Sequence, residues 1–400
     1  GEIQGAGKAM ILRKITLPLV LPAILSAVIL TFSKAIGTFG TINYLGSPVQ
    51  YYTLSSQLYM NINSRDTQTG FAMAILMIII ASIAVFVNQK LIGSRKSYAT
   101  IGGKGGRSTL IGLGKVGRPV ITAALFVFFA VGIIMPIVIL VMESFMLKEG
   151  IYSLDNFTLH YWIGESNPQI MEGLPGIFKN DEFINSLFNS LRLTLVNGVF
   201  GTIFGQLLGY ITAKGRGRLH GKLVEQLVFI PYLIPSVAFG GIYLSMFSQP
   251  QQIFGVTLVP ALYGTFALLT LVSVVKHLPF AARAGTSNML QISGELEEAA
   301  TIEGAGFFRR FVKIVFPLSK GGFISGFMLI FVSIMKELDL IILIMTPTTS
   351  TLPYLAFRYQ NGNSPQASDC VAIVMFSIVF LVYAIANLSG KADLAKSMAG

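Results

Sequence analysis

"EAATIEGAGFFRRFVKIVFPL", residues Glu298–Leu318, repeats a pattern that the chain has already shown in "IQGAGKAMILRKITLPL", residues Ile3–Leu19. At a constant offset of 299 positions, 8 of the 17 residues in the earlier stretch are identical to those in the later one. Each stretch stands directly before a long apolar run, and the offset holds through that run as far as Pro48 and Pro347. A repeat of this length indicates that the chain is built from two related units.

The composition predicts that the surroundings of this chain are a lipid bilayer. Hydrophobic residues make up 53% of the 400 positions and charged residues only 12%, whereas soluble domains carry about 25% charged residues. Continuous apolar runs of roughly 20 residues are typical of membrane-crossing helices, because the strands of a barrel alternate with a period of two. Eight such runs are present, at 19–45, 71–92, 119–142, 186–213, 225–247, 257–278, 319–346 and 370–390.

We therefore expect an all-α polytopic membrane protein with two parallel repeats, since both copies of the loop enter the membrane from the same side. Residues 1–92 form the end of the first unit, 93–118 a basic, glycine-rich cytoplasmic linker, and 119–400 a second unit of six crossings. Four crossings precede the second loop and none precedes the first. This difference favours an N-terminally incomplete sequence in which the corresponding helices lie before Gly1.

The net charge of +11 is interpreted as a topology signal, not as a nucleic-acid footprint. If residues 279–317 are cytoplasmic and successive segments alternate sides, 22 of the 29 Lys and Arg residues, Lys276 among them, fall on or beside the cytoplasmic segments. The opposite-side segment 143–185 holds seven acids against two lysines. This bias fits the positive-inside rule, and it predicts a multi-pass membrane protein.

The repeated loop is predicted to be a cytoplasmic docking element. The sequence indicates a helix from Gly294 to Glu303, a break at Gly304 and a second short helix with cations at its end, which suits the helix dipoles. A merely solvated loop has no need to keep Gly-Ala-Gly, Lys-Ile and Pro-Leu in register twice.

The spacing of this loop resembles the EAA motif of the permeases of ATP-binding-cassette (ABC) importers: EAA, three residues, Gly, nine residues, Ile, one residue, Leu-Pro. Phe316 replaces the usual Leu, and the EAA itself is cut off in the first copy. The resemblance implies a type I (MetI-like) transmembrane fold in which this loop couples the permease to its ATPase. The implied coupling residues are Gly5, Ala6, Gly7, Glu298, Ala299, Ala300, Gly304, Ala305, Gly306, Ile314 and Pro317.

The paired arrangement is most similar to fused ferric-iron (Fe³⁺) permeases, through "FSKAIGTFGTINYLG" (Phe32–Gly46) and "KELDLIILIMTPTTSTLPYLAF" (Lys336–Phe357). The resemblance implies two cytoplasmic ATPase subunits, an extracytoplasmic substrate-binding protein and no cofactor, ATP being bound by the partner. It implies no catalytic residue in this chain. Thiamine, phosphonate, polyamine and sulfate permeases share much of the pattern and remain alternatives, as does a secondary transporter, which also has repeats.

Four ionisable residues fall inside the predicted crossings. Such groups are costly in a membrane and usually face a cavity or pair with one another. Lys336 and Asp339 are three residues apart and can meet on one helix face, while Lys34 is expected to approach Glu337 if the repeats face each other. A translocation gate and a structural ion pair both remain open.

Other features give weaker expectations. Pro231 and Pro235 predict a bent crossing, and the glycines of "GVFGTIFGQLLGY" predict close helix packing. The three histidines are far apart, no metal-ligand spacing is present, and no carboxylate cluster is expected within the helices. The lack of a nucleophile–base pair argues against a membrane-embedded enzyme.

Overall fold

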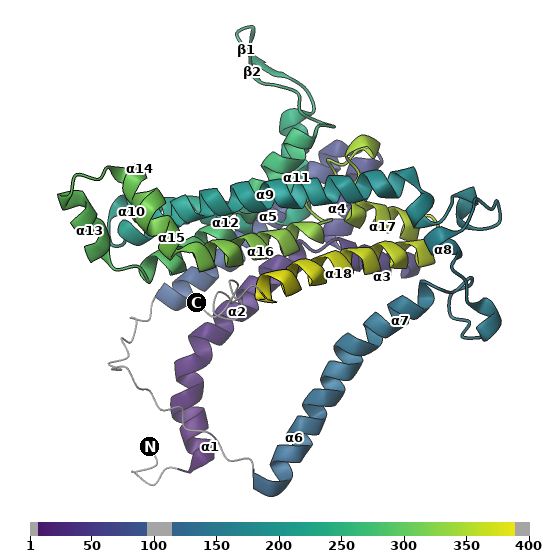
Figure 1. Ribbon diagram of the computed structural model, residues 1–400, viewed down its shortest axis with the longest axis horizontal. Coiled ribbons are helices and arrows are strands. Elements are labelled where there is room, and N and C mark those ends of the chain that lie inside the picture. The colour runs from purple at the N-terminus through teal and green to yellow at the C-terminus, as the bar shows by residue number, and fades with distance from the viewer. Residues whose placement is uncertain (1–6, 94–113, 389–400) are drawn as a thin grey trace.

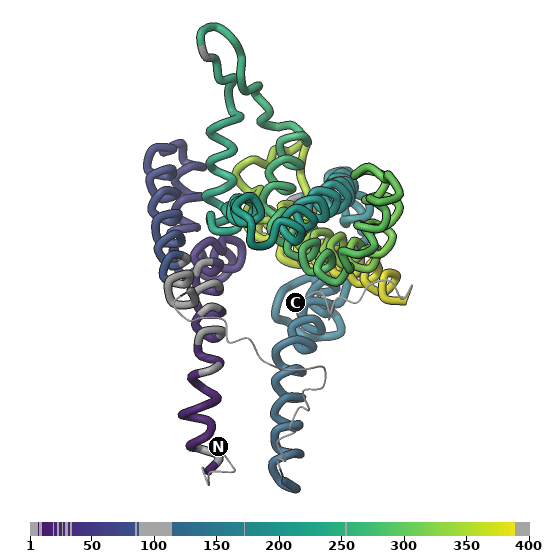
Figure 2. The backbone as a smooth tube through the Cα atoms, turned by 90° about the vertical axis from the view of Figure 1, so that its left-hand side faces the viewer, coloured from purple at the N-terminus to yellow at the C-terminus, as the bar shows by residue number. Residues whose placement is uncertain are grey.

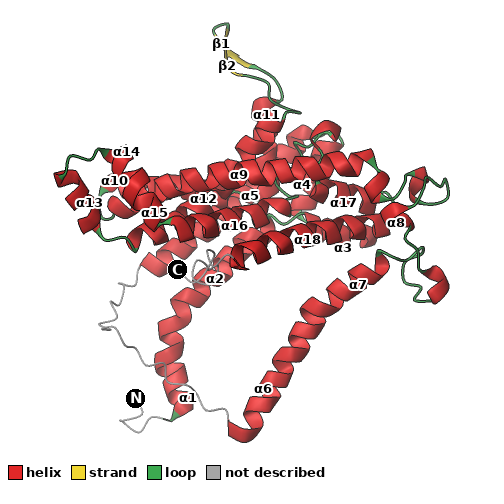
Figure 3. Ribbon diagram, in the orientation of Figure 1, coloured by secondary structure: helices red, strands yellow, loops and turns green. Residues whose placement is uncertain are grey.

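A computed structural model describes residues 7–93 and 114–388, and most of these residues are helical (Figures 1 and 3). The first repeat contributes α1 (Lys8–Ile11), the π-helix η2 (Leu12–Thr16), α2 (Leu17–Ile36), α3 (Gly40–Gly46), η3 (Ser47–Val49), α4 (Leu54–Asn63) and α5 (Thr67–Gly93). The second repeat contributes α6 (Gly114–Phe129), η4 (Ala130–Ile134), α7 (Met135–Glu143), η5 (Leu154–Asn156), α8 (His160–Ile163), η6 (Met171–Gly173), η7 (Ile177–Lys179), α9 (Asp181–Lys214), α10 (Leu219–Leu233), α11 (Ser236–Phe247), β1 (Gln251–Ile253), β2 (Val256–Val259), α12 (Phe266–Leu290), α13 (Gly294–Ile302), α14 (Phe307–Arg310), η8 (Phe311–Val315), α15 (Phe316–Leu318), α16 (Lys320–Met335), η9 (Pro347–Thr349), α17 (Leu352–Asn361) and α18 (Pro365–Leu388).

The repeat that the sequence predicts is present in the backbone at the same offset of 299 positions. The π-helices η2 and η8 correspond residue for residue, and the preceding helices α1 and α14 do so as well. Each π-helix ends two residues before a proline, Pro18 or Pro317. Because proline has no N–H to donate, the regular hydrogen-bond ladder is interrupted there, and a single wide turn accommodates the interruption.

Five helices of the described residues are long and apolar enough to cross a membrane, or up to seven if each bent pair is one span. The five are Thr67–Ala84, Gly114–Glu143, Asp181–Lys214, Phe266–Leu290 and Pro365–Leu388. The predicted crossing at 225–247 is a bent pair, with α10 and α11 at 98° to each other. This bend occurs at Pro235, where the sequence predicts an interruption.

Two predicted crossings end earlier than expected. The run 319–346 is helical only to Met335, and the run 19–45 breaks after Ile36. The polar residues that follow Met335 leave the helix for a series of turns. Irregular backbone at membrane depth is tolerated where it is buried in protein or lines a cavity, and this is what the site below shows.

The prediction of a crossing at 257–278 was wrong at both ends. The strands β1 and β2 pair antiparallel where the run was expected to begin, and α12 extends beyond Pro279 to Leu290. The extension follows from packing, because α12 lies against the glycine face of α9. Similarly, α6 begins at Gly114, so the last five residues of the predicted linker 93–118 are helical, and residues 94–113 lie outside the described part.

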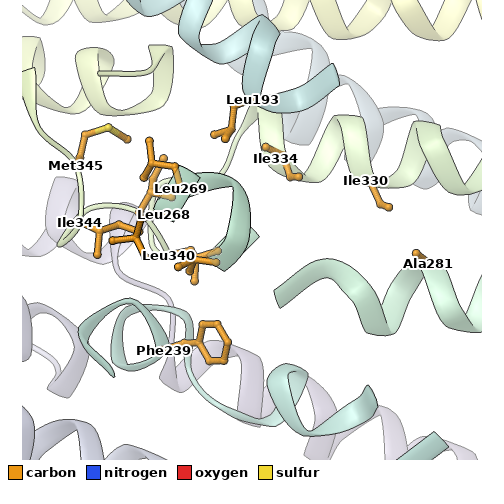
Figure 4. Packing of buried hydrophobic residues seen from close by; sticks show 12 residues of the cluster. Leu193, Phe239, Leu268, Leu269, Ala281, Ile330, Ile334, Leu340, Ile344 and Met345 are labelled. Atoms are coloured by element: carbon orange, nitrogen blue, oxygen red, sulfur yellow. The ribbon is translucent and has the colours of Figure 1, made fainter. Parts of the chain in front are cut away.

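Helices α9, α12 and α16 pack side by side and form the main core (Figures 1 and 4). A Cβ atom added at Gly205 would lie 2.6 Å from the carbonyl carbon of Ala281, and one at Gly209 would lie 2.4 Å from that of Gly285. Only glycine permits this approach, which confirms the predicted packing role of the glycine stripe. The elements α13 and α14 lie at one end of these long helices, and α8 lies at the opposite end (Figure 1).

The predicted outer segment 143–185 contains four short helical turns between α7 and α9. Asn180 caps α9, its side-chain oxygen accepting a hydrogen bond from the N–H of Glu182 at 2.8 Å. Asp181 is the first helical residue, and its carboxylate in the first turn suits the helix dipole.

Candidate functional site: an exposed elbow and a central cavity

The second elbow, residues 294–318, owes its shape to one helix cap. Gly304 has a φ of +78°, a left-handed conformation that favours glycine. The N–H of Ala305 donates to the carbonyl of Ala300 at 2.9 Å, and the N–H of Gly304 donates to that of Thr301 at 3.0 Å. This pair of bonds is a Schellman motif. The spacing EAA, three residues, Gly therefore places the glycine at the one position after α13 where the chain must turn.

Glu297 attaches the second elbow to α9. Its Oε2 accepts a hydrogen bond from the Tyr210 hydroxyl at 2.6 Å, and its Oε1 lies 2.6 Å from the Lys214 ammonium. Tyr210 and Lys214 are one helical turn apart, so both reach the same carboxylate. The Tyr210 ring also contacts the ring of Phe307, with centroids 5.6 Å apart. The second elbow is thus joined to the end of α9 by an ion pair, a hydrogen bond and a ring contact.

The second elbow exposes apolar side chains beyond this attachment. Ile302 is 86% exposed and Phe308 is 80% exposed. The predicted coupling residues of this elbow lie on its surface: Glu298, Ala299, Gly304, Gly306 and Pro317 are exposed, and Ala300, Ala305 and Ile314 are partly buried. In the first elbow, residues 3–19, Gly7 is exposed. Gly5 and Ala6 lie outside the described residues.

A central cavity of about 890 Å³ lies where the two repeats meet. The lining of this cavity includes Lys34, Lys336, Glu337 and Asp339. These are the four ionisable residues predicted to form a gate or an ion pair. They come from the ends of α2 and α16 and from the turns that follow α16, where the predicted crossings stop early. The cavity therefore lies where α2 and α16 end before the predicted ends of their crossings.

Asp339 joins the repeats across this cavity. Its Oδ1 accepts a hydrogen bond from the Gly40 N–H at 2.8 Å, and its Oδ2 accepts one from the Phe39 N–H at 3.1 Å. Hydrogen bonds to a charged group contribute about 1.5–3 kcal/mol each. Sequence reasoning selected Asp339 but paired it with Lys336, and no ion pair joins those two side chains in the described part of the chain.

Glu337 does not pair with Lys34, contrary to the expected approach. Its Oε2 lies 3.5 Å from Nε2 of His277, and its Oε1 accepts the N–H of Leu340 at 3.0 Å. The physical reason is that α12 passes closer to the end of α16 than α2 does, so a side chain within the second repeat reaches the carboxylate first. Lys34 and Glu337 therefore do not form the ion pair between repeats that was one of the two expectations.

The charge count groups Lys276 with the residues on or beside the cytoplasmic segments, but its side chain does not face solvent. It is buried in the cavity wall, where its ammonium donates to the carbonyl of Pro231 at 2.9 Å and to that of Ile234. The break between α10 and α11 leaves these carbonyls without helical partners. The charged pair "KH" within an apolar run was the signal that could have placed Lys276 and His277 inside the protein.

Four aromatic rings from both repeats contact one another, and three of them line either the central cavity or a second pocket. The second pocket has a volume of about 460 Å³ and is lined by Tyr59 and Phe357, whereas Tyr44 lines the central cavity. The Phe39 ring lies 4.7 Å from that of Tyr59 and 5.6 Å from that of Phe357, and Tyr44 lies 5.9 Å from Phe357. We call Phe39, Tyr44, Tyr59 and Phe357 the aromatic cluster.

Several acidic side chains elsewhere have their own partners. Glu165 lies 2.5 Å from the Lys179 ammonium, which holds the pKa of this carboxyl below its usual range, and Glu182 pairs with Arg358. Three carboxylates, Glu337, Asp339 and Asp369, line the central cavity, although none was expected to cluster within the helices. Even so, no group of three or more His, Cys, Asp or Glu residues in the described ranges is arranged to hold a metal ion.

Comparison with known families decides what this arrangement is. The family described as "Binding-protein-dependent transport system inner membrane component" matches residues 1–98 and 201–392. The chain belongs to this family. It is therefore a multi-pass permease component of the bacterial inner membrane, and the predicted resemblance to ABC importer permeases is confirmed.

Individual relatives differ in their cargo. The chain is 22% identical over 394 residues to the ferric transport system permease protein FbpB of Actinobacillus pleuropneumoniae, covering 96% of this chain and 53% of the relative. It is 26% identical over 212 residues to the sulfate permease CysT of Synechocystis, and the match covers 51% of this chain and 71% of that relative. It is 28% identical over 203 residues to the molybdate/tungstate permease WtpB of Thermococcus kodakarensis, and the match covers 50% of this chain and 76% of that relative. The chain thus spans about half the length of the ferric relative.

The fold also has a solved counterpart. A permease chain of a bacterial ABC transporter involved in the import of the polysaccharide alginate matches with a TM-score of 0.53 at 16% identity, covering 68% of this chain and 94% of that one. This likeness confirms the predicted type I importer fold.

Proposed function

We propose that this chain is the permease subunit of an ATP-driven importer that takes its cargo from an extracytoplasmic binding protein. Two cytoplasmic ATPase subunits hydrolyse ATP, and the two elbows of this chain, around Gly5 and Gly304, each receive one of them. The central cavity forms part of the translocation path. This proposal rests on the family and on the geometry of the second elbow.

The exposure of the second elbow is the observation that carries the coupling role. A charged loop that only linked two crossings would not expose Ile302 and Phe308 almost fully while fixing Glu297 to α9. Exposed apolar side chains on an element that is rigidly attached are typical of a docking surface. Because α9 packs along α12 and α16, a push on the elbow reaches the cavity wall.

The contacts around the cavity support a gate. Asp339 joins the repeats through two hydrogen bonds, and the rings of the aromatic cluster contact one another across the repeats beside the cavity and the second pocket. Passage of a cargo requires the two repeats to move apart at these contacts. We assign Lys34, Lys336, Glu337 and Asp339 to the lining of this gate.

Ferric iron is the proposed cargo. The ferric relative aligns with 96% of this chain, whereas the sulfate and molybdate relatives align with about half of it. In this proposal the binding protein provides the affinity for iron and the permease provides the path. Sulfate, molybdate, thiamine, phosphonate and polyamine are the competing cargoes.

Reconstitution tests both parts of the proposal. The full permease is placed in proteoliposomes with its ATPase and its binding protein, and uptake of radiolabelled iron, sulfate and molybdate is compared. We expect iron uptake that requires both ATP and the binding protein. Uptake of sulfate alone would replace the cargo and leave the importer intact. Uptake by the permease alone, driven by an ion gradient, would favour a secondary transporter and overturn the proposal.

A further inference from the structure

The loop between α11 and α12 carries a hairpin with an amphipathic pattern. Strands β1 and β2 pair antiparallel, with Gln252 opposite Thr257. Phe254 and Gly255 form the tip with φ values of +51° and +81°, which is the conformation of a tight two-residue hairpin turn. Since side chains alternate along a strand, Val256 and Leu258 share one face of β2 and Thr257 faces the other way.

The apolar face and tip of this hairpin have no protein partner in the described structure. Phe254 is fully exposed at 102%, and Val256 and Leu258 are each 61% exposed. Figures 1 and 2 both show the hairpin projecting away from the helices, across the direction of α9. A projecting apolar tip of this kind is unfavourable in water and marks an interaction site.

The depth of the hairpin follows from α12. This helix runs 25 residues from Phe266 to the end next to the second elbow, a length of about 37 Å at 1.5 Å per residue. The hydrocarbon core of a bilayer is about 30 Å thick. With the elbow outside the bilayer on one side, Phe266 lies near the opposite boundary. A hairpin that leaves this point across the direction of the helices runs along the membrane surface.

The charge pattern identifies lipid as the partner. No Asp, Glu, Lys or Arg occurs anywhere from residue 226 to residue 275. Recognition between proteins at a membrane surface uses complementary charges for specificity and rate, and this segment has none to offer. Amphipathic elements that lie in the interface bury their apolar face at the boundary of the acyl chains. We propose that the hairpin Gln251–Val259 is inserted in the outer-leaflet interface, with Phe254, Val256 and Leu258 toward the acyl chains.

A lipid anchor at the hairpin would also constrain the cavity wall, because the hairpin directly follows α11 in the chain. The first residue of α11, Ser236, lines the cavity beside the break at Pro235. A Cβ atom at Gly240 would lie 2.3 Å from the carbonyl oxygen of Leu340, so α11 also touches the turns after α16. The lipid anchor therefore fixes the outer end of the helix whose inner end forms the cavity wall.

A single-tryptophan reporter tests the anchor. Residues 1–400 contain one tryptophan, Trp162, so Trp162→Phe with Phe254→Trp places the only indole of these residues at the tip. With any tryptophan outside residues 1–400 also replaced by phenylalanine, in phosphatidylcholine vesicles we expect blue-shifted emission and at least a twofold loss of intensity when the lipids carry bromine at the upper acyl positions. Phe126→Trp, on the exposed face of α6, gives the lipid reference, and Leu154→Trp, in segment 143–185, gives the aqueous reference.

A matched pair of charges tests the orientation. Added to the reporter, Leu258→Asp is expected to abolish most of the bromolipid quenching, whereas Thr257→Asp on the polar face leaves it within a quarter of its original value. Emission from position 254 that matches position 154 and is not quenched would overturn the proposal. A shift that occurs only when the binding protein is added would also overturn it and would assign the hairpin to that protein. Iron uptake is measured in parallel, so a wrong cargo and a wrong anchor give separate results.

Discussion

The two repeats share their backbone at the cavity but differ in their side chains. Positions 40 and 339 are equivalent at the offset of 299, yet the first repeat has glycine there and the second has aspartate. These two equivalent residues contact each other, with the Gly40 N–H donating to the Asp339 carboxylate. Lys34 is likewise matched by Ser333, and Lys336 by Gly37.

This difference shows what a fused pair of repeats allows. At a twofold axis a residue meets its own equivalent. Two aspartates at this point would repel each other, and two glycines would leave buried N–H groups without partners. One of each is complementary. A single chain with two repeats can therefore carry an asymmetric contact that identical subunits cannot.

The largest expected effect comes from making this contact symmetric. Gly40→Asp sets a second carboxylate beside Asp339, at a site where an added Cβ would already lie 3.3 Å from the Asp339 Oδ1. We expect a destabilisation on the order of 3 kcal/mol and at least a 100-fold loss of uptake. The exchanged variant Gly40→Asp with Asp339→Gly is the control, and it should regain a measurable part of the activity. Equal loss in both would show that the two positions are not complementary.

The second-largest effect is expected when the charge of Glu297, which attaches the second elbow to α9, is reversed. Glu297→Lys places a second cation next to Lys214. Breaking a buried ion pair costs about 3–5 kcal/mol. The cost is smaller here, because Lys214 is one-third exposed and solvent screens its charge. We expect uptake to fall 10- to 100-fold while basal ATP hydrolysis by the partner persists. Lys214→Glu added to Glu297→Lys should restore uptake several-fold. If the double variant is no better than the single one, the pair does not transmit the motion.

The pairing of Glu337 gives an intermediate prediction. Because its partner is His277, the double reversal Lys34→Glu with Glu337→Lys is expected to stay as inactive as Glu337→Lys alone, with about a tenfold loss of uptake. The isosteric Glu337→Gln, which keeps the hydrogen bond from Leu340, should lose less. Recovery of transport in the double reversal would instead support a direct Lys34–Glu337 contact between the repeats.

The smallest effect is expected at the helix cap. Gly304→Ala forces a Cβ into the left-handed conformation, at a cost of about 1 kcal/mol, in a place where no neighbouring atom lies within 4 Å of it. Uptake should fall by two- to fivefold, measured with thermal unfolding as a second readout. Gly306→Ala, two residues on, has no positive φ and is the matched control. A similar loss at Gly306 would mean that contact with the partner, and not backbone strain, accounts for both effects.

Much of this architecture was predictable because it depends on local chemistry that repeats. The EAA spacing predicts the cap at Gly304, and the glycines at 205 and 209 predict the tight packing of α9. The partners of the cavity charges were not predictable in the same way. His277 reaches Glu337, and Lys276 satisfies carbonyls freed by a break 42 residues earlier, only because α10, α12 and α16 fold to one place. The hairpin at Gln251–Val259 was missed because its apolar composition matches that of a crossing helix.

The central claim is that the second elbow is the point at which the ATPase acts. A photoreactive amino acid at position 308, in the reconstituted importer, tests it most directly. We predict covalent adducts with the ATPase from position 308 and none from the control position 154 at the opposite end of the helices. Adducts with the ATPase from position 154, or their absence from 308 in an importer that hydrolyses ATP and transports normally, would contradict the account.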